Sequence, residues 1–148
     1  MLNKLLSQKI YPYFGFSIRV VLLLLLCTPT VIADSNTPKL VYLIVDENKL
    51  IASNIEFNRF DELKLRAKEM VIQQSVGSAV AVVVTNQRII AYSVFTASWK
   101  TKSFKADENV QNVEAEDYSA LVVTSKRLLS FNGKTAVWAE TPRSSIFQ

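Results

Sequence analysis

Apolar and polar positions follow one another in a recurring order along the second half of the chain. Two apolar runs of strand length, residues 81–85 (AVVVT) and 120–124 (ALVVT), are rich in β-branched side chains. Two polar residues follow each run, and then comes a second apolar run. This layout is typical of strands joined by a tight hairpin. Because both first runs are apolar throughout, we predict that each forms a strand buried on both faces of its sheet.

The same order of residues repeats with a period of 39. The shift places Thr85 on Thr124, Arg88 on Arg127 and Trp99 on Trp138 without a gap. A weaker first copy carries Lys49 in place of the arginine and Phe60 in place of the tryptophan. Fixed-period similarity of this length indicates stacked structural repeats. We therefore predict a single β-repeat domain, residues 34–148, with units at about residues 37–68, 69–107 and 108–148.

Each unit has room for three or four antiparallel strands. In the last unit, Asn132 and Gly133 form a pair that suits a type I′ hairpin turn, and residues 135–141 (TAVWAET) follow as a further strand. Residues 108–116 (ENVQNVEAE) supply a short preceding strand. The sequence thus predicts an all-β fold of three tandem blade-like antiparallel units, either propeller-like or closed like a trefoil.

One segment also matches a helix. Residues 60–74 (FDELKLRAKEMVIQQ) place apolar side chains on one helical face, whereas the matching residues 99–113 have no such stripe. Aligned repeats should share a fold, so strand and loop are the preferred prediction for residues 60–75. A helix inserted between the first two repeats is the alternative.

The segment VVTSKRLLSF (residues 122–131), with Trp138 following, resembles the blades of bacterial β-propellers. In those blades a hydrophobic strand, a Thr-x-x-Arg turn, an aliphatic pair and a late Trp recur once per blade. The resemblance implies a propeller-like fold with rims and a central mouth for partners. Closed propellers have four or more blades. With three units, either several chains complete a ring, or the units close on themselves like a trefoil, or the protein is a fragment of a larger propeller ancestor.

The N-terminal segment has the layout of an export signal. Three basic residues and no acid precede an apolar run from Val20 to Ala33, which is too short to cross a bilayer as a helix. Small residues at Val31 and Ala33 match a signal-peptidase site, so we predict that residues 1–33 are cleaved. An uncleaved anchor that retains residues 10–33 and faces outside the cytoplasm is the alternative. The predicted location is exported, either periplasmic or secreted.

Composition narrows the chemistry of the mature chain. The whole chain has 17 basic and 13 acidic residues, and removal of residues 1–33 takes away three basic ones, which leaves a charge near +1. This is too low to favour nucleic acid as a partner. The chain has no histidine, and its one cysteine, Cys27, lies in the predicted signal. Serine or cysteine triads and ordinary zinc sites are therefore excluded, and we expect neither metal nor cofactor.

Two functional hypotheses remain. The first is a non-catalytic binding or assembly module of the cell envelope, which binds a protein partner or associates with itself through open β edges. The second is a small hydrolase of envelope glycans that uses paired acids among Glu114, Glu116, Asp117 and Glu140. The repeated positions are interpreted as structural: threonines that bond turn backbone, basic side chains that brace the hairpin, and aromatic rings between units. These positions are Thr85, Thr124, Arg88, Arg127, Phe60, Trp99 and Trp138.

Overall fold

A computed structural model of the chain describes residues 37–143. The predicted signal segment, residues 1–33, lies outside the described residues. No helix that could span a membrane occurs within the described part of the chain.

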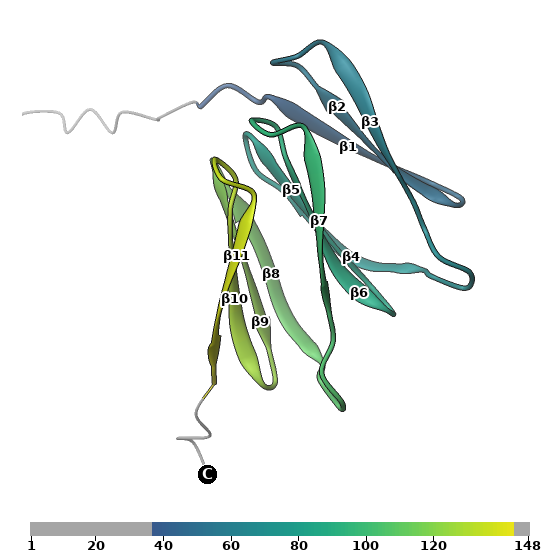
Figure 1. Cartoon of the computed structure of the whole chain (residues 1–148), viewed down its shortest axis with the longest axis vertical. Helices are drawn as coiled ribbons and strands as arrows, with labels where there is room; N and C mark the ends of the chain where they lie inside the picture. The colour runs from purple at the N-terminus through teal and green to yellow at the C-terminus, as the bar shows by residue number, and fades with distance from the viewer. Residues whose placement is uncertain (1–36, 144–148) are drawn as a thin grey trace, which may run out of the picture. The chain divides into compact units, whose positions relative to one another are not determined.

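The described residues form eleven strands in three antiparallel sheets (Figure 1). The first sheet has three strands, and the second and third have four each, always in the order of a meander. The strands are β1 (Val41–Asp46), β2 (Lys49–Asn54), β3 (Arg59–Lys64), β4 (Val71–Val76), β5 (Val80–Thr85), β6 (Arg88–Ser93), β7 (Ser98–Ser103), β8 (Val110–Glu116), β9 (Ser119–Thr124), β10 (Arg127–Asn132) and β11 (Val137–Pro142). The predicted all-β fold of three blade-like units is confirmed.

The helix alternative for residues 60–75 is wrong. Those residues form most of β3, a turn and most of β4. β3 pairs with β2 from Lys49↔Lys64 to Asn54↔Arg59, and β4 pairs with β5. The apolar spacing of residues 60–75 fits either a helix or a strand, and pairing with the neighbouring strands β2 and β5 makes these residues strands.

Equivalent strands of successive sheets are separated by the same number of residues. β1, β2 and β3 lie 39 residues before β5, β6 and β7, which in turn lie 39 residues before β9, β10 and β11. The counterpart of β4 and β8 in the first sheet would fall on residues 32–37, of which only the last is described. The left-handed backbone positions obey the same period, because Asn58, Ala97 and Ala136 have φ values of 49°, 47° and 52°.

The three sheets pack face to face as a fan, with the second sheet in the middle (Figure 1). Alternate residues of β5 and β6 face opposite ways, as expected for strands. Ala81, Val83, Ile90 and Tyr92 pack on the first sheet, whereas Val82 and its neighbours pack on the third. Within residues 37–143 the first and third sheets lie on opposite faces of the second, so trefoil-like closure is not the arrangement.

Only one of the two apolar runs is buried on both faces. Every residue of β5 is buried. β9 instead alternates, with Ala120, Val122 and Thr124 buried and Leu121 exposed. The prediction is wrong for β9 because no fourth sheet covers its outer side within the described residues.

The predicted type I′ turn at Asn132 and Gly133 is also wrong. The loop is longer and has its left-handed residue at Ala136, whereas Gly133 has no positive φ. The glycine is needed for a close approach. A Cβ there would collide with the Val80 side chain and lie 2.6 Å from the Tyr118 carbonyl oxygen. Asn132 closes the loop by accepting hydrogen bonds from the Lys134 and Thr135 amides.

Candidate functional site

A buried ion pair joins the first and second sheets at one end. Arg88 Nε donates to Glu69 Oε1 at 2.8 Å, and Arg88 Nη2 donates to Glu69 Oε2 at 3.0 Å. The Thr85 hydroxyl lies 2.8 Å from Glu69 Oε1 and accepts a hydrogen bond from the Arg88 amide. Arg88 Nη2 also donates to the carbonyl of Lys64, the last residue of β3, at 3.4 Å. The arginine thus braces its own hairpin and contacts the preceding sheet.

Electrostatics stabilise the charged form of this glutamate. Burial alone would raise the pKa of Glu69, because the low-dielectric interior disfavours charge. Hydrogen bonds from Arg88, the Arg66 amide and Thr85, together with the positive charge of Arg88, outweigh burial and lower the pKa to about 2.

The third sheet repeats the arrangement. Arg127 donates to both oxygens of Glu108 at 2.8 and 3.0 Å, and the Thr124 hydroxyl lies 2.7 Å from Glu108. Arg127 Nη2 donates to the carbonyl of Ser103, the last residue of β7, at 2.7 Å. The pKa of Glu108 is lowered by the same groups, which outweigh its burial. Both arginines are buried and bonded within the protein, so neither presents its charge to a ligand.

The three repeated aromatic positions differ in their surroundings. Trp99 packs on Tyr92 with ring centroids 4.9 Å apart, and its Nε1 donates to the Asp61 carbonyl at 3.3 Å. Trp138 packs on Phe131 at 5.0 Å. Phe60, in the first sheet, is 66% exposed.

A polar network that the sequence analysis missed also connects the first and second sheets. The Tyr92 hydroxyl donates to Asp61 Oδ2 at 2.5 Å and accepts from Asn54 Nδ2 at 2.7 Å. Burial and the hydrogen bond to Asp61 both raise the pKa of Tyr92. Asp61 has no acidic counterpart in the later repeats, where Lys100 and Ala139 stand, so comparison of the repeats could not find it. Asn54 aligns with Ser93 and then with an identical residue, Asn132, but this match was not used. The Glu69 and Glu108 match was visible, and its shared spacing to the arginines was the signal.

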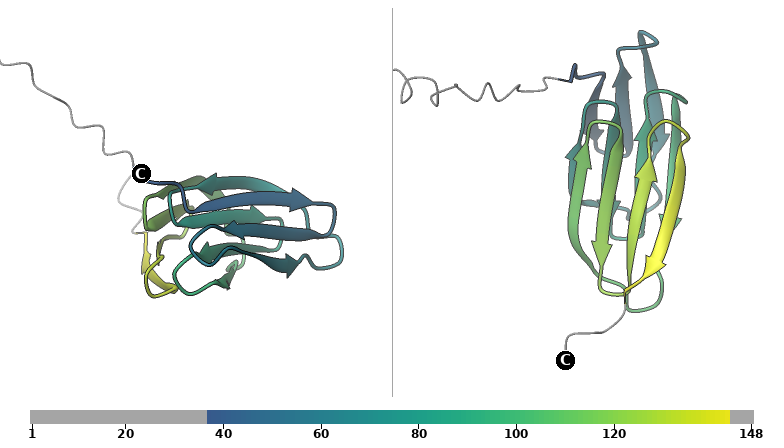
Figure 2. Two further views of the ribbon diagram at one scale, coloured as in Figure 1. Left: turned by 90° about the horizontal axis from the view of Figure 1, so that it is seen from above. Right: turned by 90° about the vertical axis from the view of Figure 1, so that its left-hand side faces the viewer.

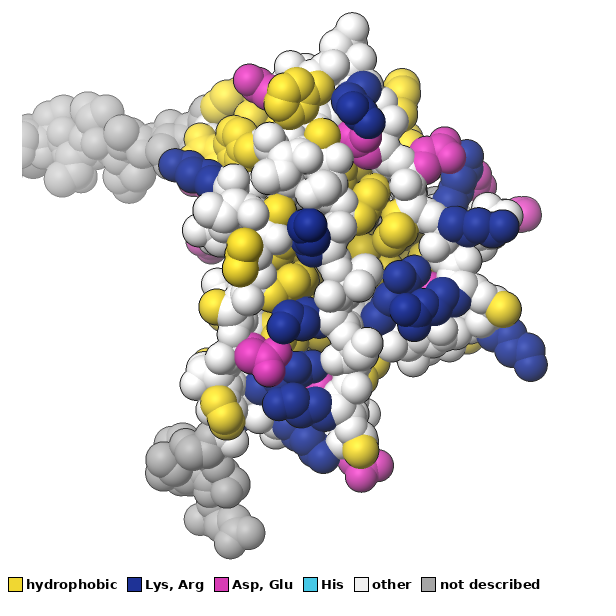
Figure 3. All heavy atoms as spheres, viewed as in Figure 1, with side chains coloured by type: hydrophobic (Ala, Val, Ile, Leu, Met, Phe, Trp, Pro, Cys, Tyr) yellow, Lys and Arg dark blue, Asp and Glu magenta, His cyan; other side chains and the backbone are white. Residues whose placement is uncertain are grey.

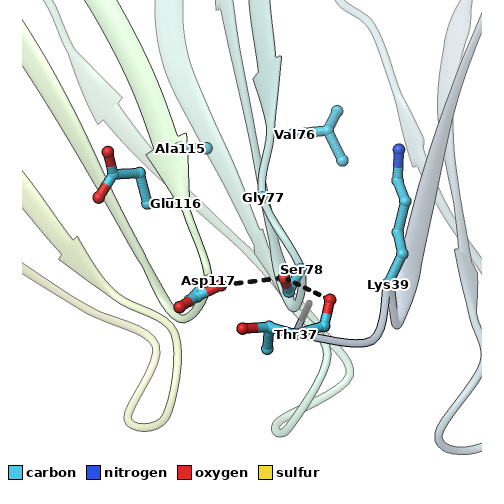
Figure 4. Close-up of a pocket in the computed structure, with 8 residues that line it drawn as sticks. All are labelled: Thr37, Lys39, Val76, Gly77, Ser78, Ala115, Glu116 and Asp117. Carbon is cyan, nitrogen blue, oxygen red and sulfur yellow. Dashed lines mark hydrogen bonds between the residues drawn. The ribbon is translucent and has the colours of Figure 1, made fainter. Parts of the chain in front are cut away.

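A hollow of about 400 Å³ lies where equivalent turns of the three units meet (Figure 4). Its polar lining includes Lys39, Ser78 and Asp117, which occupy one position of the repeat. The Ser78 hydroxyl lies 3.1 Å from Asp117 Oδ1 and 3.5 Å from the Thr37 carbonyl oxygen. In Figure 4 the Lys39 and Glu116 side chains stand on opposite sides of the hollow and do not point toward each other. The charged groups therefore do not converge on one point.

The four acids considered for hydrolysis are spread over the third sheet. Glu140 lies 2.7 Å from Arg127 and 3.2 Å from Lys102. The hydrogen bond from Lys102 and the surrounding basic charges lower the pKa of Glu140, whereas a general acid needs a raised one. Asp117 accepts from Ser78 across the hollow, and Glu114 accepts from Asn112. The structure thus gives three of these acids polar partners of their own.

The first sheet exposes apolar side chains on the face turned away from the second sheet, which we call the N-face. Tyr42 is 50% exposed and Ile44 48%, although their repeat counterparts Ala81 and Val83 are fully buried. The cross-strand pairs Tyr42↔Ser53↔Phe60 and Ile44↔Ile51↔Glu62 fix this face. Its main residues are Tyr42, Ile44, Asp46, Lys49, Ile51 and Phe60.

The third sheet has a matching open face on its far side, which we call the C-face. Figure 2 (right) looks onto its strands β8–β11. Leu121, Leu128 and Val137 are 39%, 37% and 59% exposed. A hollow of about 290 Å³ with a mostly apolar lining lies among Leu121, Leu128 and Ala139. The face consists mainly of Leu121, Val123, Leu128, Ser130, Val137 and Ala139.

Charge is mixed over the surface. On the side shown in Figure 3, basic and acidic side chains interleave, and apolar ones show between the sheets. Several exposed charges are paired, for instance Lys49 with Glu62 at 2.9 Å. Within the described residues, no group of three or more acidic, histidine or cysteine side chains is placed to hold a metal ion.

Comparisons with known proteins show a likeness of shape only. No family model matches the chain, and no curated protein matches it. Among solved structures, the N-terminal domain of Nup159 superimposes with a TM-score of 0.39 and 11% sequence identity. The match covers 69% of this chain and 30% of that structure, so the chain spans about a third of its length. The class that the chain's own fold defines is an all-β protein of stacked, blade-like repeats.

Proposed function

We propose that the protein is a non-catalytic binding or assembly module of the cell envelope. The supporting observation is the N-face, where apolar side chains are exposed at positions that the second and third sheets bury. Contiguous apolar surface of this kind marks sites of protein–protein contact. A protein partner that covers the N-face would bury Tyr42, Ile44 and Phe60 together.

Within residues 37–143, β1 is the outermost strand of the first sheet and pairs only with β2. Tyr42 and Ile44 on this strand are half exposed. An outer strand with exposed apolar side chains is a surface that proteins usually cover, which supports the same proposal. The hydrolase hypothesis lacks comparable support, since Glu140 is occupied by ion pairs.

Export is the part of the proposal that rests on the sequence alone. The basic N-terminal segment, the short apolar run and the small residues before Asp34 support cleavage after Ala33. N-terminal sequencing of the protein recovered from the producing cell tests this directly. A start at Asp34 supports export with cleavage, and a start at Met1 favours the anchored alternative.

Site-specific crosslinking tests the binding surface. A photo-reactive phenylalanine analogue at Tyr42 or Phe60 should form a covalent adduct with the protein partner. The crosslinked partner should then also bind the purified, unmodified chain. The matched control is the same analogue at Ala67, an exposed turn residue between the first and second sheets. If N-face positions give no protein adduct beyond that control, the proposed function is wrong.

A further inference from the structure

We propose that the partner of the N-face is the C-face of a second copy, so that two chains form one ring of six sheets. This inference rests on the proposed function and names its partner. Its basis is that the two interfaces inside the chain share apolar layers and hydrogen bonds at the same repeat positions. Each interface joins the face of one sheet that corresponds to the C-face with the face of the next sheet that corresponds to the N-face. Within residues 37–143 the N-face and the C-face themselves pack against no further sheet.

The apolar layers show the repetition first. Leu50 and Ala52 of the first sheet pack toward the second sheet, and Ile89 and Ala91 at the same repeat positions pack toward the third. Leu128 holds this position on the C-face and is 37% exposed. On the opposite face of each sheet, Val83 packs against the first sheet and Val122 packs against the second. Their repeat counterpart on the N-face is Ile44, which is 48% exposed.

A backbone hydrogen bond between the inner turns repeats in the same way. The Leu40 amide donates to the Ser78 carbonyl at 2.7 Å, and 39 residues later the Ala79 amide donates to the Asp117 carbonyl at 2.7 Å. The next donor in the series is the Tyr118 amide, at the C-face. The preceding acceptor is the Lys39 carbonyl, at the N-face. A head-to-tail contact would bring this donor and this acceptor together.

A side-chain donor forms a second series. Asn54 Nδ2 donates to the Val94 carbonyl at 3.0 Å, and the Ser93 hydroxyl donates to the Gly133 carbonyl. Asn132 is the third member and lies at the C-face. Its Oδ1 accepts the amides of its own loop, just as Asn54 Oδ1 accepts the Phe57 amide.

Because Oδ1 of both asparagines accepts amides of its own loop, Nδ2 of Asn132 is oriented as Nδ2 of Asn54 is, toward the next sheet in the series. Its acceptor across the proposed interface is the carbonyl of Ile55, which is the repeat counterpart of Val94 and Gly133.

The repeated basic side chains form a third series of hydrogen bonds. Here the donor belongs to the later sheet and the acceptor to the preceding sheet, the reverse of the first two series. Arg88 donates to the Lys64 carbonyl and Arg127 to the Ser103 carbonyl, each at the end of the preceding sheet. Lys49 is the counterpart on the N-face, and the Pro142 carbonyl is the counterpart at the end of the third sheet. A lysine ammonium on a long stem can reach such a carbonyl as a single donor.

The three series decide the kind of contact. Each needs its donor and acceptor from opposite faces, so two N-faces packed together would satisfy none of them. A head-to-tail contact closes into a ring or grows into a filament. Closed propellers generally have four to eight blades. Six is the multiple of three within that range, and it corresponds to two copies.

Native mass spectrometry and light scattering of the purified full chain test the ring. We expect a dimer at micromolar concentration. Ile44→Asp on the N-face and Leu128→Asp on the C-face should each give monomer, because a charge in the interface is costly. The matched control is Ile72→Asp, which replaces an apolar residue 68% exposed outside both faces and should remain dimeric.

Mixing the two variants distinguishes head-to-tail from face-to-face contact. Ile44→Asp retains an intact C-face, and Leu128→Asp retains an intact N-face, so the mixture should recover dimer through one good interface. Asn132→Ala should weaken the wild-type dimer about thirtyfold, because each of the two interfaces of the ring loses one hydrogen bond worth roughly 1 kcal/mol and about 1.4 kcal/mol is a factor of ten. Circular dichroism of every variant checks that the fold is retained.

Several outcomes would overturn the ring. These are a folded wild-type monomer, a dimer broken by Ile44→Asp but unaffected by Leu128→Asp, and a concentration-dependent ladder of larger species. An N-face adduct with a different protein would support the proposed function and reject a second copy as the partner. Absence of any N-face adduct would reject both proposals.

Discussion

The buried Glu69–Arg88 pair gives a sharp prediction of stability and its pH dependence. Glu69→Gln removes the negative charge and leaves the Arg88 guanidinium buried. The pKa of Glu69 falls from 4.5 to about 2 in the folded protein. At about 1.4 kcal/mol per pKa unit, the charged form contributes about 3 kcal/mol at pH 7. Loss of one partner from a buried ion pair is expected to cost about 3–5 kcal/mol, which agrees in size.

The sign follows from the lowered pKa. The contribution of Glu69 is complete above the unfolded-state pKa of about 4.5 and disappears as the pH falls toward 2. At pH 3 linkage leaves less than half of it, about 1 kcal/mol. Urea unfolding of the wild type and Glu69→Gln at pH 7 and pH 3 measures both values. Glu108 contributes equally to both proteins, so its titration cancels in the difference.

The control is Glu62→Gln, which removes the exposed partner of Lys49. Surface ion pairs contribute little to stability because solvent screens them, so this variant should stay close to the wild type. Replacement of both partners by Glu69→Leu and Arg88→Met should cost less than Glu69→Gln alone, because no charge is left unpaired. A Glu69→Gln loss below about 1 kcal/mol at pH 7, or one that does not shrink at pH 3, would refute the reasoning.

Three further substitutions test the backbone and the buried hydroxyl by thermal and urea unfolding. Ala97→Gly should stabilise by about 0.5–1 kcal/mol, because alanine is strained at its φ of 47°; a destabilised variant would contradict this. Gly133→Ala should destabilise by several kcal/mol, since its Cβ would meet the Val80 side chain and a backbone carbonyl, and unchanged stability would show that the loop yields easily. Tyr92→Phe should cost roughly 1–3 kcal/mol, because Asp61 loses its buried donor; a neutral effect would mean that solvent replaces the hydroxyl.

The strands could be predicted from the sequence because apolar runs and their 39-residue period are local features. The predictions failed where a neighbouring sheet decides the outcome. Leu121 sits in an apolar run like that of Val82, but it is exposed because no sheet of the described residues packs on the outer side of β9. Gly133 suggested a turn through its dihedral freedom, yet its role is to admit Val80 from the second sheet.

The candidate surface shows the same limit. The pattern of Tyr42 and Ile44 is that of any half-buried strand, and their exposure depends on which sheets are present beside them. The repeat could be read from one sequence, but the faces that remain open could be seen only after the sheets were stacked. Asp61 and Tyr92 lie 31 residues apart in the chain and meet only across the first interface.

The central position of the second sheet sets a gradient of local unfolding. β5 and β6 are buried along their whole length, whereas β1 and β11 are mostly exposed. In stacked repeats stability is approximately a sum of unit and nearest-neighbour terms, so outer units open before the centre. Amide hydrogens of β5 and β6 should therefore exchange most slowly in an isolated chain. A ring would remove the ends of the stack, and the gradient would flatten because every sheet would have two neighbours.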